Sequence, residues 1–236
     1  MFNAQRQARC TALAVDSTLP AEAGSCALTD AVYFRTAGNE GTVTANQYTL
    51  YAELATSGEA LPVSPVVLNA WQNGTTANAL ELSASSGDGT SAMRITPAPL
   101  AWGWGMTWGL SGNAEVDLSN FNGGNLQFRL KTTYPGKLEI GFLTGNATDG
   151  TAYDVYIPVS SGQYGYVNDG EWHTVSIPIA QIVAHGAPAY GMSAPTSRLL
   201  LNRVSNMLVL ADRYSNTLNS PNNTTPLWVD NIRWTR

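Results

Sequence analysis

Charged side chains are scarce in this 236-residue chain, where they make up 12% of the residues, about half the usual share of roughly 25%. The 12 Lys and Arg residues are scattered singly, and with 17 Asp and Glu residues they give a net charge of -5. Nucleic-acid binding requires a basic patch that displaces counterions from phosphates. No such patch is visible along the chain, so the sequence predicts no nucleic-acid partner and favours an uncharged ligand, a class that includes neutral sugars.

Cysteine is nearly absent as well, with Cys10 and Cys26 the two occurrences. No histidine lies near them, which argues against a zinc site. Together with few lysines and many Asn, Thr and Ser residues, the pair is typical of a secreted bacterial protein with one short-loop disulfide. Two free buried thiols are the alternative.

Long apolar runs are also missing. No window approaches the ~20 apolar residues of a membrane span, so the sequence predicts no membrane partner. The first residues lack the apolar region of a signal peptide. We therefore expect a mature or excised domain of an extracellular or periplasmic protein.

The residues that are plentiful favour β-structure. The chain holds 22 Gly, 7 Trp, 10 Tyr and 5 Phe residues. Aromatic and β-branched residues favour sheets, while Gly and Asn favour tight turns. Short apolar or alternating runs separated by turn signals are typical of a sandwich or barrel. The composition therefore predicts an all-β chain, and 236 residues suit one large domain.

The chain divides into two parts by pattern. Residues 1–45 show little periodicity, and we interpret them as an irregular N-terminal arm, pinned by the cysteines if these are bridged; a remnant linker to an upstream domain is the alternative. Residues 46–236 are predicted to form the β-sandwich, with one short helix at Ile179–His185. The strands expected within that part are Gln47–Leu54, Val66–Trp71, Ala79–Ser83, Ala92–Thr96, Met106–Leu110, Ala114–Asp117, Asn125–Thr132, Lys137–Leu143, Ala152–Pro158, Trp172–Ile177, Met207–Asp212 and Leu227–Trp234.

One pair of expected strands carries the clearest pattern. Apolar residues fall at every second position in Leu126–Leu130 and again in Leu138–Phe142, so one face of each is buried. Tyr134-Pro-Gly136 supplies a short turn between them. The pattern predicts an antiparallel hairpin.

Three tryptophans within seven residues, Trp102, Trp104 and Trp108, alternate with glycine. In a strand they share one face. Sugar rings stack on flat aromatic faces, and glycine lets a ligand approach the backbone. The segment predicts either a sugar-stacking surface or a tryptophan layer of the core with a glycine bulge. Tyr164 and Tyr166 are candidates for a further stacking surface.

Asp230 lies between apolar residues of the last expected strand, where an unpaired buried charge is costly. A structural Ca²⁺ would satisfy it with carbonyl and carboxylate oxygens; hydrogen bonding to Arg94, Arg203 or a turn is the alternative. We find no recognisable catalytic motif, and no catalytic residue is assigned. Hydrolysis of a glycan requires two facing carboxylates, and no pair of acids stands out for that role.

From about residue 66 onward the chain resembles the galactose-binding-like modules that follow the catalytic domain in bacterial family 3 exo-β-glucanases, and related carbohydrate-binding modules. The resemblance rests on six segments, of which the last two are moderately specific: Trp102–Gly109, Val116–Ser119, Gly124–Thr132, Lys137–Phe142, Gly170–Pro178 and Trp228–Ile232. It implies a jelly-roll β-sandwich without catalytic residues, often with a structural calcium, in which Asp230 matches an aspartate that helps to hold the ion. No catalytic domain is visible in this chain.

Three functions are therefore in competition. The leading hypothesis is a non-catalytic module that binds a neutral polysaccharide, most simply a β-glucan, and targets an associated glycoside hydrolase. The second is a glycoside hydrolase or lyase on a jelly-roll scaffold. The third is a structural domain that packs on a catalytic partner, which would bury the tryptophans and leave a large apolar patch.

Overall fold

The structure is a computed structural model of the chain. It describes residues 46–53, 60–62, 66–73, 76–87, 91–98, 103–110, 114–145, 153–185, 187–188, 201–213 and 224–236. The predicted N-terminal arm, its Cys10–Cys26 pair and Trp102 lie outside the described residues.

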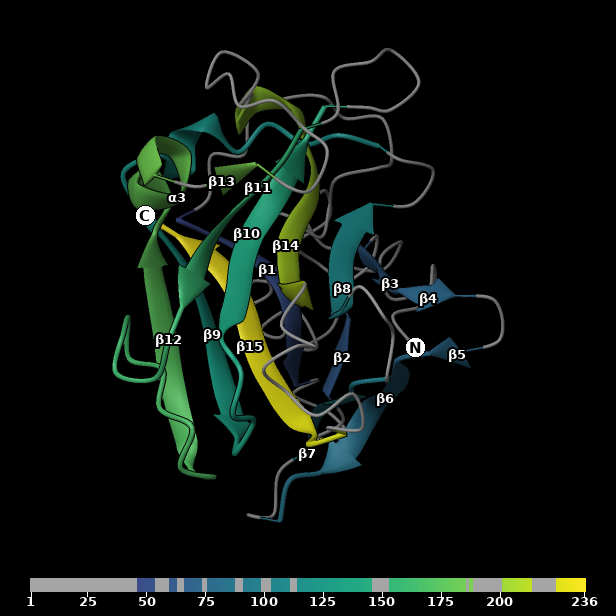
Figure 1. Cartoon of the computed structure of the whole chain (residues 1–236). Helices are drawn as coiled ribbons and strands as arrows, with labels where there is room; N and C mark the ends of the chain where they lie inside the picture. Colours follow the sequence, from purple (N-terminus) through teal and green to yellow (C-terminus); the bar gives the residue numbers. More distant parts are fainter. Residues whose placement is uncertain are drawn as a thin grey trace, which may run out of the picture.

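Two large antiparallel sheets contain most of the strands in the described part of the chain. In Figure 1 the sheet that contains β8, β10 and β14 lies in front of the sheet that contains β9 and β15. The predicted all-β sandwich of antiparallel strands is confirmed. The front sheet has six strands, in the order β13 (Ala187–Pro188), β11 (Tyr153–Val159), β10 (Leu138–Thr144), β14 (Val204–Arg213), β8 (Gly103–Leu110) and β3 (Val66–Ala70).

The second sheet has seven strands and is organised around the last one. The C-terminal strand pairs with β9 along one edge and with both β7 and β1 along the other. The strands of this sheet are β12 (Trp172–Pro178), β9 (Asn125–Thr132), β15 (Leu227–Thr235), β1 (Gln47–Glu53) and β2 (Ala60–Pro62), with β7 (Ser91–Thr96) on β15 and β6 (Ala79–Ser85) on β7. A separate two-stranded ribbon joins β4 (Gln72–Asn73) to β5 (Thr76–Ala77).

Helical structure is limited in the described residues. The predicted helix at Ile179–His185 is confirmed as α3, and two single 3₁₀ turns, η3 (Ser119–Phe121) and η6 (Leu201–Arg203), connect strands. No helix among the described residues is long and apolar enough to cross a membrane.

The predicted hairpin at the Tyr134-Pro-Gly136 turn is wrong. The strand before the turn, β9, pairs with β12 and β15, whereas the strand after it, β10, pairs with β11 and β14. The turn carries the chain from one sheet to the other, so the two apolar faces meet across the core. Ala114–Asp117 also differs from the prediction, because it forms no extended strand; isolated bridge pairing, such as that of Val116 with Val204, takes its place in the described residues.

The core lies between the two sheets and follows the alternation of the strands. In β9 the residues alternate strictly between half-buried and buried. Facing them from the other sheet, β10 and β14 bury aliphatic and aromatic residues, and Trp234 of β15 packs on Phe142 with ring centroids 5.1 Å apart. Every second residue of these strands therefore points into one shared core.

A polar chain crosses this core. The Trp104 indole N–H donates to the Tyr134 hydroxyl at 2.9 Å, and that hydroxyl donates to Asp212 Oδ2 at 2.7 Å. All three side chains are at most 2% exposed. Buried polar groups are costly without partners, so the Tyr134 hydroxyl links the start of β8 to the end of β14.

We expect Tyr134→Phe to lower the free energy of unfolding by about 1–3 kcal/mol, because it removes the acceptor of the Trp104 N–H and a donor to Asp212. Urea denaturation would measure the loss. Tyr164→Phe is the matched control, since its hydroxyl bonds to Gln181 in an exposed position. Equal losses in the two variants would contradict a special role for the buried chain.

Candidate functional site

The Trp-Gly segment forms β8, and its register places the tryptophans inside. Trp104 and Trp108 are 2% and 0% exposed. Their rings face the core because Trp104 pairs with Asp212 and Trp108 with Leu208, both on the inner face. The prediction that these two rings stack on a sugar is therefore wrong, and the alternative of a tryptophan layer in the core holds. Trp102 lies outside the described residues.

The glycines of the same segment occupy the opposite, outer face of the six-stranded sheet. Another tryptophan, Trp71, uses the space that Gly105 leaves. A methyl group at Gly105 would lie 2.7 Å from Cε3 and Cζ3 of the Trp71 ring, closer than such contacts occur. The ring therefore lies directly against the backbone of β8, which only glycine permits.

Trp71 is held in this place by its backbone. Its N–H donates to the Gly105 carbonyl at 2.9 Å. The amide of Asn78, 4% exposed, donates to the carbonyls of both Trp71 and Gly105 at 3.2 and 3.0 Å, and its oxygen accepts the Ala98 N–H at 2.9 Å. One buried side chain thus fixes the Trp71 backbone to β8, and the ring remains half-buried at the surface.

A guanidinium lies between this ring and a second aromatic ring. Arg213 Cζ is 5.4 Å from the ring centroid of Trp71 and 4.4 Å from that of Tyr156, which is also half-buried. Both distances are within the range of cation–π attraction. Tyr156 comes from β11, opposite Gly141 of β10. The outer face therefore carries two aromatic rings joined by one cation.

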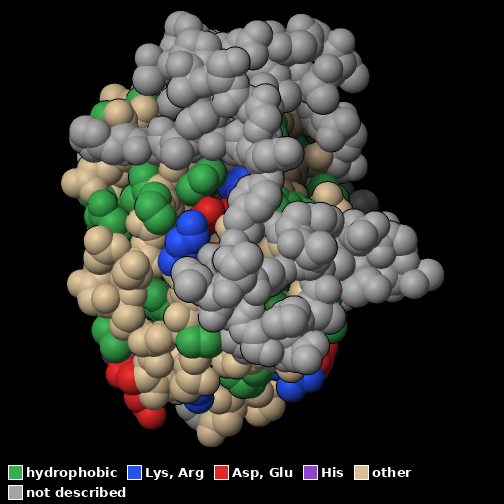
Figure 2. All heavy atoms as spheres, in the orientation of Figure 1, with side chains coloured by type: hydrophobic (Ala, Val, Ile, Leu, Met, Phe, Trp, Pro, Cys, Tyr) green, Lys and Arg blue, Asp and Glu red, His purple; other side chains and the backbone are tan. Residues whose placement is uncertain are grey.

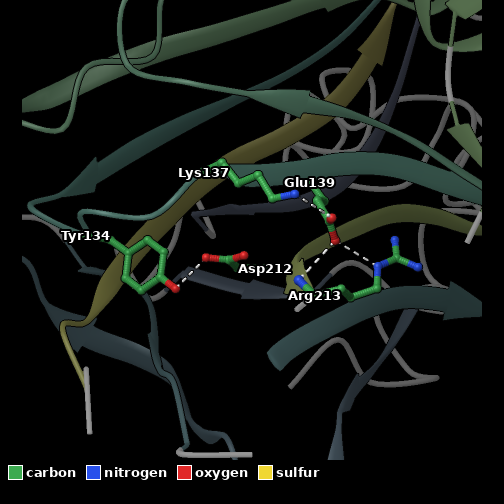
Figure 3. A network of polar contacts seen from close by, with 5 residues as sticks. All are labelled: Tyr134, Lys137, Glu139, Asp212 and Arg213. Atoms are coloured by element: carbon green, nitrogen blue, oxygen red, sulfur yellow. Dashed lines mark hydrogen bonds and ion pairs between the residues drawn. The ribbon is translucent and has the colours of Figure 1, made fainter. Parts of the chain in front are cut away.

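The charge of Arg213 is balanced on the same face. Glu139, 1% exposed, accepts hydrogen bonds from the backbone N–H and Nε of Arg213 at 3.0 and 2.9 Å, and Lys137 Nζ lies 3.4 Å from its other oxygen. Figure 3 shows the neighbours Asp212 and Arg213 pointing apart, Asp212 toward Tyr134 and Arg213 toward Glu139. Asp212 thus points into the core, and the next residue of β14, Arg213, points toward the outer face of the sheet.

Charged and apolar groups alternate over this side of the molecule. Figure 2, seen from the side of Figure 1, shows Lys or Arg side chains next to Asp or Glu among hydrophobic ones. Asn69 of β3 and Thr107 of β8, which pair with each other, add polar groups to the same face. We call the set Trp71, Tyr156, Arg213, Glu139 and Lys137 the aromatic face. Flat rings beside fixed donors and acceptors suit a ligand with apolar C–H faces and hydroxyl edges.

The two predicted tyrosines lie elsewhere. Tyr166 is 0% exposed, so the prediction that it contacts a ligand is wrong; it packs between the sheets, and its hydroxyl points at the Tyr134 carbonyl at 3.5 Å. Tyr164 is half-buried in the connection between β11 and β12, where its carbonyl accepts the Ser176 N–H and its hydroxyl bonds to Gln181. The structure brings neither tyrosine into the aromatic face.

Burial, and secondarily the charge of Asp212, raise the pKa of Tyr166 to about 12. The unfolded chain releases this proton near pH 10, so stability falls as the pH rises from about 10 toward 12. We expect Tyr166→Phe to reduce that fall, by up to about 3 kcal/mol. Urea denaturation at several alkaline pH values would measure it, and an identical pH dependence in both proteins would contradict the assignment.

Asp230, the predicted calcium ligand, lies on the outer face of the seven-stranded sheet. Its two oxygens accept hydrogen bonds from the backbone N–H and the side-chain amide of Asn231 at 2.7 and 2.8 Å. The Arg129 guanidinium is 3.9 Å away. These donors and this cation do not fit a metal ligand, and no group of three acidic, His or Cys side chains in the described residues does so either. The hydrogen bonding that was the alternative is observed, with Asn231 as the donor and Arg129 as an ion-pair neighbour.

We expect Asp230→Asn to destabilise the fold by about 1 kcal/mol through these lost contacts, and calcium to leave that difference unchanged. Thermal unfolding of both proteins in excess EDTA and in excess calcium would test this. A difference that grows with calcium concentration would show that the ion binds at Asp230 after all.

The sequence did not predict Trp71 and Tyr156 as ligand-binding residues, for a different reason in each case. Trp71 ends an expected strand and stands alone, without a neighbour that marks it as a surface residue. Tyr156 lies in a strand whose alternation with Val155 and Ile157 does indicate an outward direction. That alternation was the available signal, but it could not show that β11 and β8 belong to the same sheet.

Comparison with known proteins gives a family. No curated protein sequence matches this chain. The family described as carbohydrate binding domain 30 matches residues 27–236, a stretch that begins inside the predicted arm.

Solved structures are also similar to this chain, at low sequence identity. The family 30 carbohydrate-binding module of the cellulosomal cellulase Cel9D-Cel44B of Clostridium thermocellum is 19% identical, with a TM-score of 0.53 over 79% of this chain and 95% of that one. Another family 30 module is 19% identical, with a TM-score of 0.51 over 80% and 87%. The extra C-terminal domain of an exo-1,3/1,4-β-glucanase from a Pseudoalteromonas species is 12% identical, with a TM-score of 0.39 over 81% and 86%.

Proposed function

Because this chain belongs to the carbohydrate binding domain 30 family, we propose that the aromatic face is its carbohydrate-binding surface and that the bound ligand is a neutral β-glucan. The observation that carries the proposal is the Trp71 ring on the bare backbone of Gly105, with Arg213 between it and Tyr156. The expectation of a carbohydrate-binding module is confirmed by the family; the ligand and the surface are our proposal.

The nearly balanced charges of this face support a neutral ligand. Glu139 lies between Lys137 and Arg213, so the acid offsets one of the two positive charges and only a small excess is left. A sugar hydroxyl both donates and accepts, and it can bond to either kind of group. A β-glucan is further supported by the family 30 relative, which is a module of a cellulosomal cellulase.

Binding would combine stacking with a few hydrogen bonds. The apolar face of a glucose ring would lie on Trp71, and Lys137, Thr107 and Asn69 would meet hydroxyl groups along the sheet. Arg213, 6% exposed, would hold the two aromatic rings in place. Arg213 is held by Glu139 before the ligand arrives, so little of its conformational entropy is lost on binding. This favours recognition by a preformed surface with modest affinity per site.

We further propose that the module is non-catalytic and secreted, and that it holds an associated glycoside hydrolase on its substrate. The family supports a binding role, and one relative is a module of a cellulase. The alternative of a glycan-active enzyme is addressed by assaying new reducing ends in the same samples.

Gly105→Ala gives the sharpest test of the surface. The added methyl group collides with the Trp71 ring, whereas Gly123→Ala meets nothing within 4 Å. We expect Gly105→Ala to weaken retention in affinity gels containing mixed-linkage β-glucan or soluble cellulose by about tenfold, comparable to Trp71→Ala. Gly123→Ala should leave retention unchanged.

Thermal unfolding of each variant separates lost binding from lost folding. Retention of the wild type on xylan or mannan but on no glucan would overturn the β-glucan assignment. Full retention in folded Trp71→Ala and Tyr156→Ala would overturn the aromatic face as the site. New reducing ends would contradict a non-catalytic role.

A further inference from the structure

The opposite side of the sandwich carries a row of tryptophans and cations. Cross-strand pairing on the seven-stranded sheet sets Trp172 opposite Lys131, Lys131 opposite Trp228, Trp228 opposite Arg94, and Arg94 opposite Glu81. Directly paired residues point to the same face. Five neighbouring strands thus build one continuous row on the outer face, and both tryptophans are half-buried there.

Two further arginines lie beside this row. Arg129, 36% exposed, places its Cζ 4.7 Å from the Trp172 ring centroid and lies 3.9 Å from Asp230. Arg233 pairs with Gln127 of β9 and is half-buried. Its Nε makes no hydrogen bond with any described residue. We call Trp172, Lys131, Trp228, Arg94, Arg129 and Arg233 the cationic face.

Positive charge dominates this face although the chain as a whole is acidic. It carries four cations and two acids, whereas the chain has a net charge of -5. Both acids are already engaged, Glu81 with Arg94 and Asp230 with Arg129 and Asn231. Charges that are scattered singly along the sequence are therefore gathered by the fold.

Hydrogen-bond donors also outnumber acceptors here. Four N–H groups on this face are buried without a partner among the described residues: the indole N–H of Trp172 and Trp228, and Nε of Arg94 and Arg233. Buried polar groups normally find partners. The unmatched donors add to the positive potential of the surface, which favours a ligand with negative charge.

We propose that the cationic face is a second binding surface, for an anionic polysaccharide. Its ligand supplies carboxylate or sulfate oxygens to the arginines and presents sugar C–H groups to the half-buried edges of Trp172 and Trp228. The two tryptophans are two strands apart, about 9.5 Å, a spacing that alternate rings of an extended sugar chain also span. This surface is separate from the aromatic face, which lies on the other sheet.

The geometry favours a glycan over a nucleic acid. The cations stand in a flat row across a sheet and alternate with aromatic side chains, and the Lys131 ammonium is held by the Ser86 carbonyl at 2.9 Å. Phosphate backbones are bound chiefly by charge, with a steep salt dependence. A ligand that also uses the tryptophans would depend less on salt than a nucleic acid of the same charge density.

The experiment uses affinity electrophoresis and isothermal titration of the full chain at low and at physiological salt. The probes are polygalacturonate for carboxylates, a sulfated galactan for sulfates, mixed-linkage β-glucan as the neutral glycan, and single-stranded DNA as the plain polyanion. We expect one anionic glycan to bind, and Arg94→Gln and Arg233→Gln each to weaken it by about two- to fivefold.

Arg236→Gln is the control for charge, because Arg236 lies over Phe121, away from the row, and its loss changes net charge equally. Retention on neutral β-glucan should be unchanged in Arg94→Gln and Arg233→Gln, while Trp71→Ala should leave the anionic glycan bound. The failure of one surface is thereby distinguished from the failure of the other.

Absence of binding to both anionic glycans at low salt would overturn the proposal, as would equally tight binding of DNA with the same salt dependence. Equal losses in Arg236→Gln and Arg233→Gln would show a net-charge effect and would also overturn it. Should Arg233→Gln lower the melting temperature, Arg94→Gln carries the test, because its partner Glu81 is 50% exposed and tolerates the loss.

Discussion

The pairing register of β8 between β14 and β3 is the constraint on which both the core and the binding surface depend. Because side chains alternate along a strand, a slip by one residue would exchange the two faces. In the observed register Trp104 and Trp108 fill the core, and Gly105 lies outside. The same choice makes room for Trp71 against the backbone. Stability and recognition therefore rest on one alternation, and the buried bond from Trp104 to Tyr134 helps to hold it.

The sandwich presents two outer faces of different chemistry. On the six-stranded sheet, Glu139 pairs with both Arg213 and Lys137, and two aromatic rings lie beside them. On the seven-stranded sheet, cations exceed acids and alternate with tryptophans across the strands. The difference follows from the pairing of strands distant in sequence. Arg94 of β7 and Lys131 of β9 lie close together only because both pair with Trp228 of β15. If both proposals hold, the module would bind a neutral chain and a charged one at once.

Strand positions could be predicted closely, because alternation and turn residues are local signals. The strand at Asn125–Thr132 and the helix at Ile179–His185 have the predicted bounds. Partners could not be predicted in the same way. The Tyr134-Pro-Gly136 turn favours a hairpin by its local chemistry, but β9 and β10 both have one apolar face, and burying the two against each other places them in opposite sheets. Tertiary burial decided between two arrangements that the turn itself allows.

The sequence by itself determined the fold class of this protein, an all-β sandwich rich in aromatic residues and poor in charge. Those properties depend on composition and on patterns within single strands, and both can be recognised from residues that are close together in the sequence. Carbohydrate binding was the leading of three hypotheses and rested on the resemblance to known modules. Only the tertiary structure decided which aromatic rings reach the surface. It buried Trp104, Trp108 and Tyr166 and exposed parts of Trp71 and Tyr156, because the direction of a side chain depends on which sheet and which register its strand joins. It also gathered scattered cations into one face, which no reading along the chain could show.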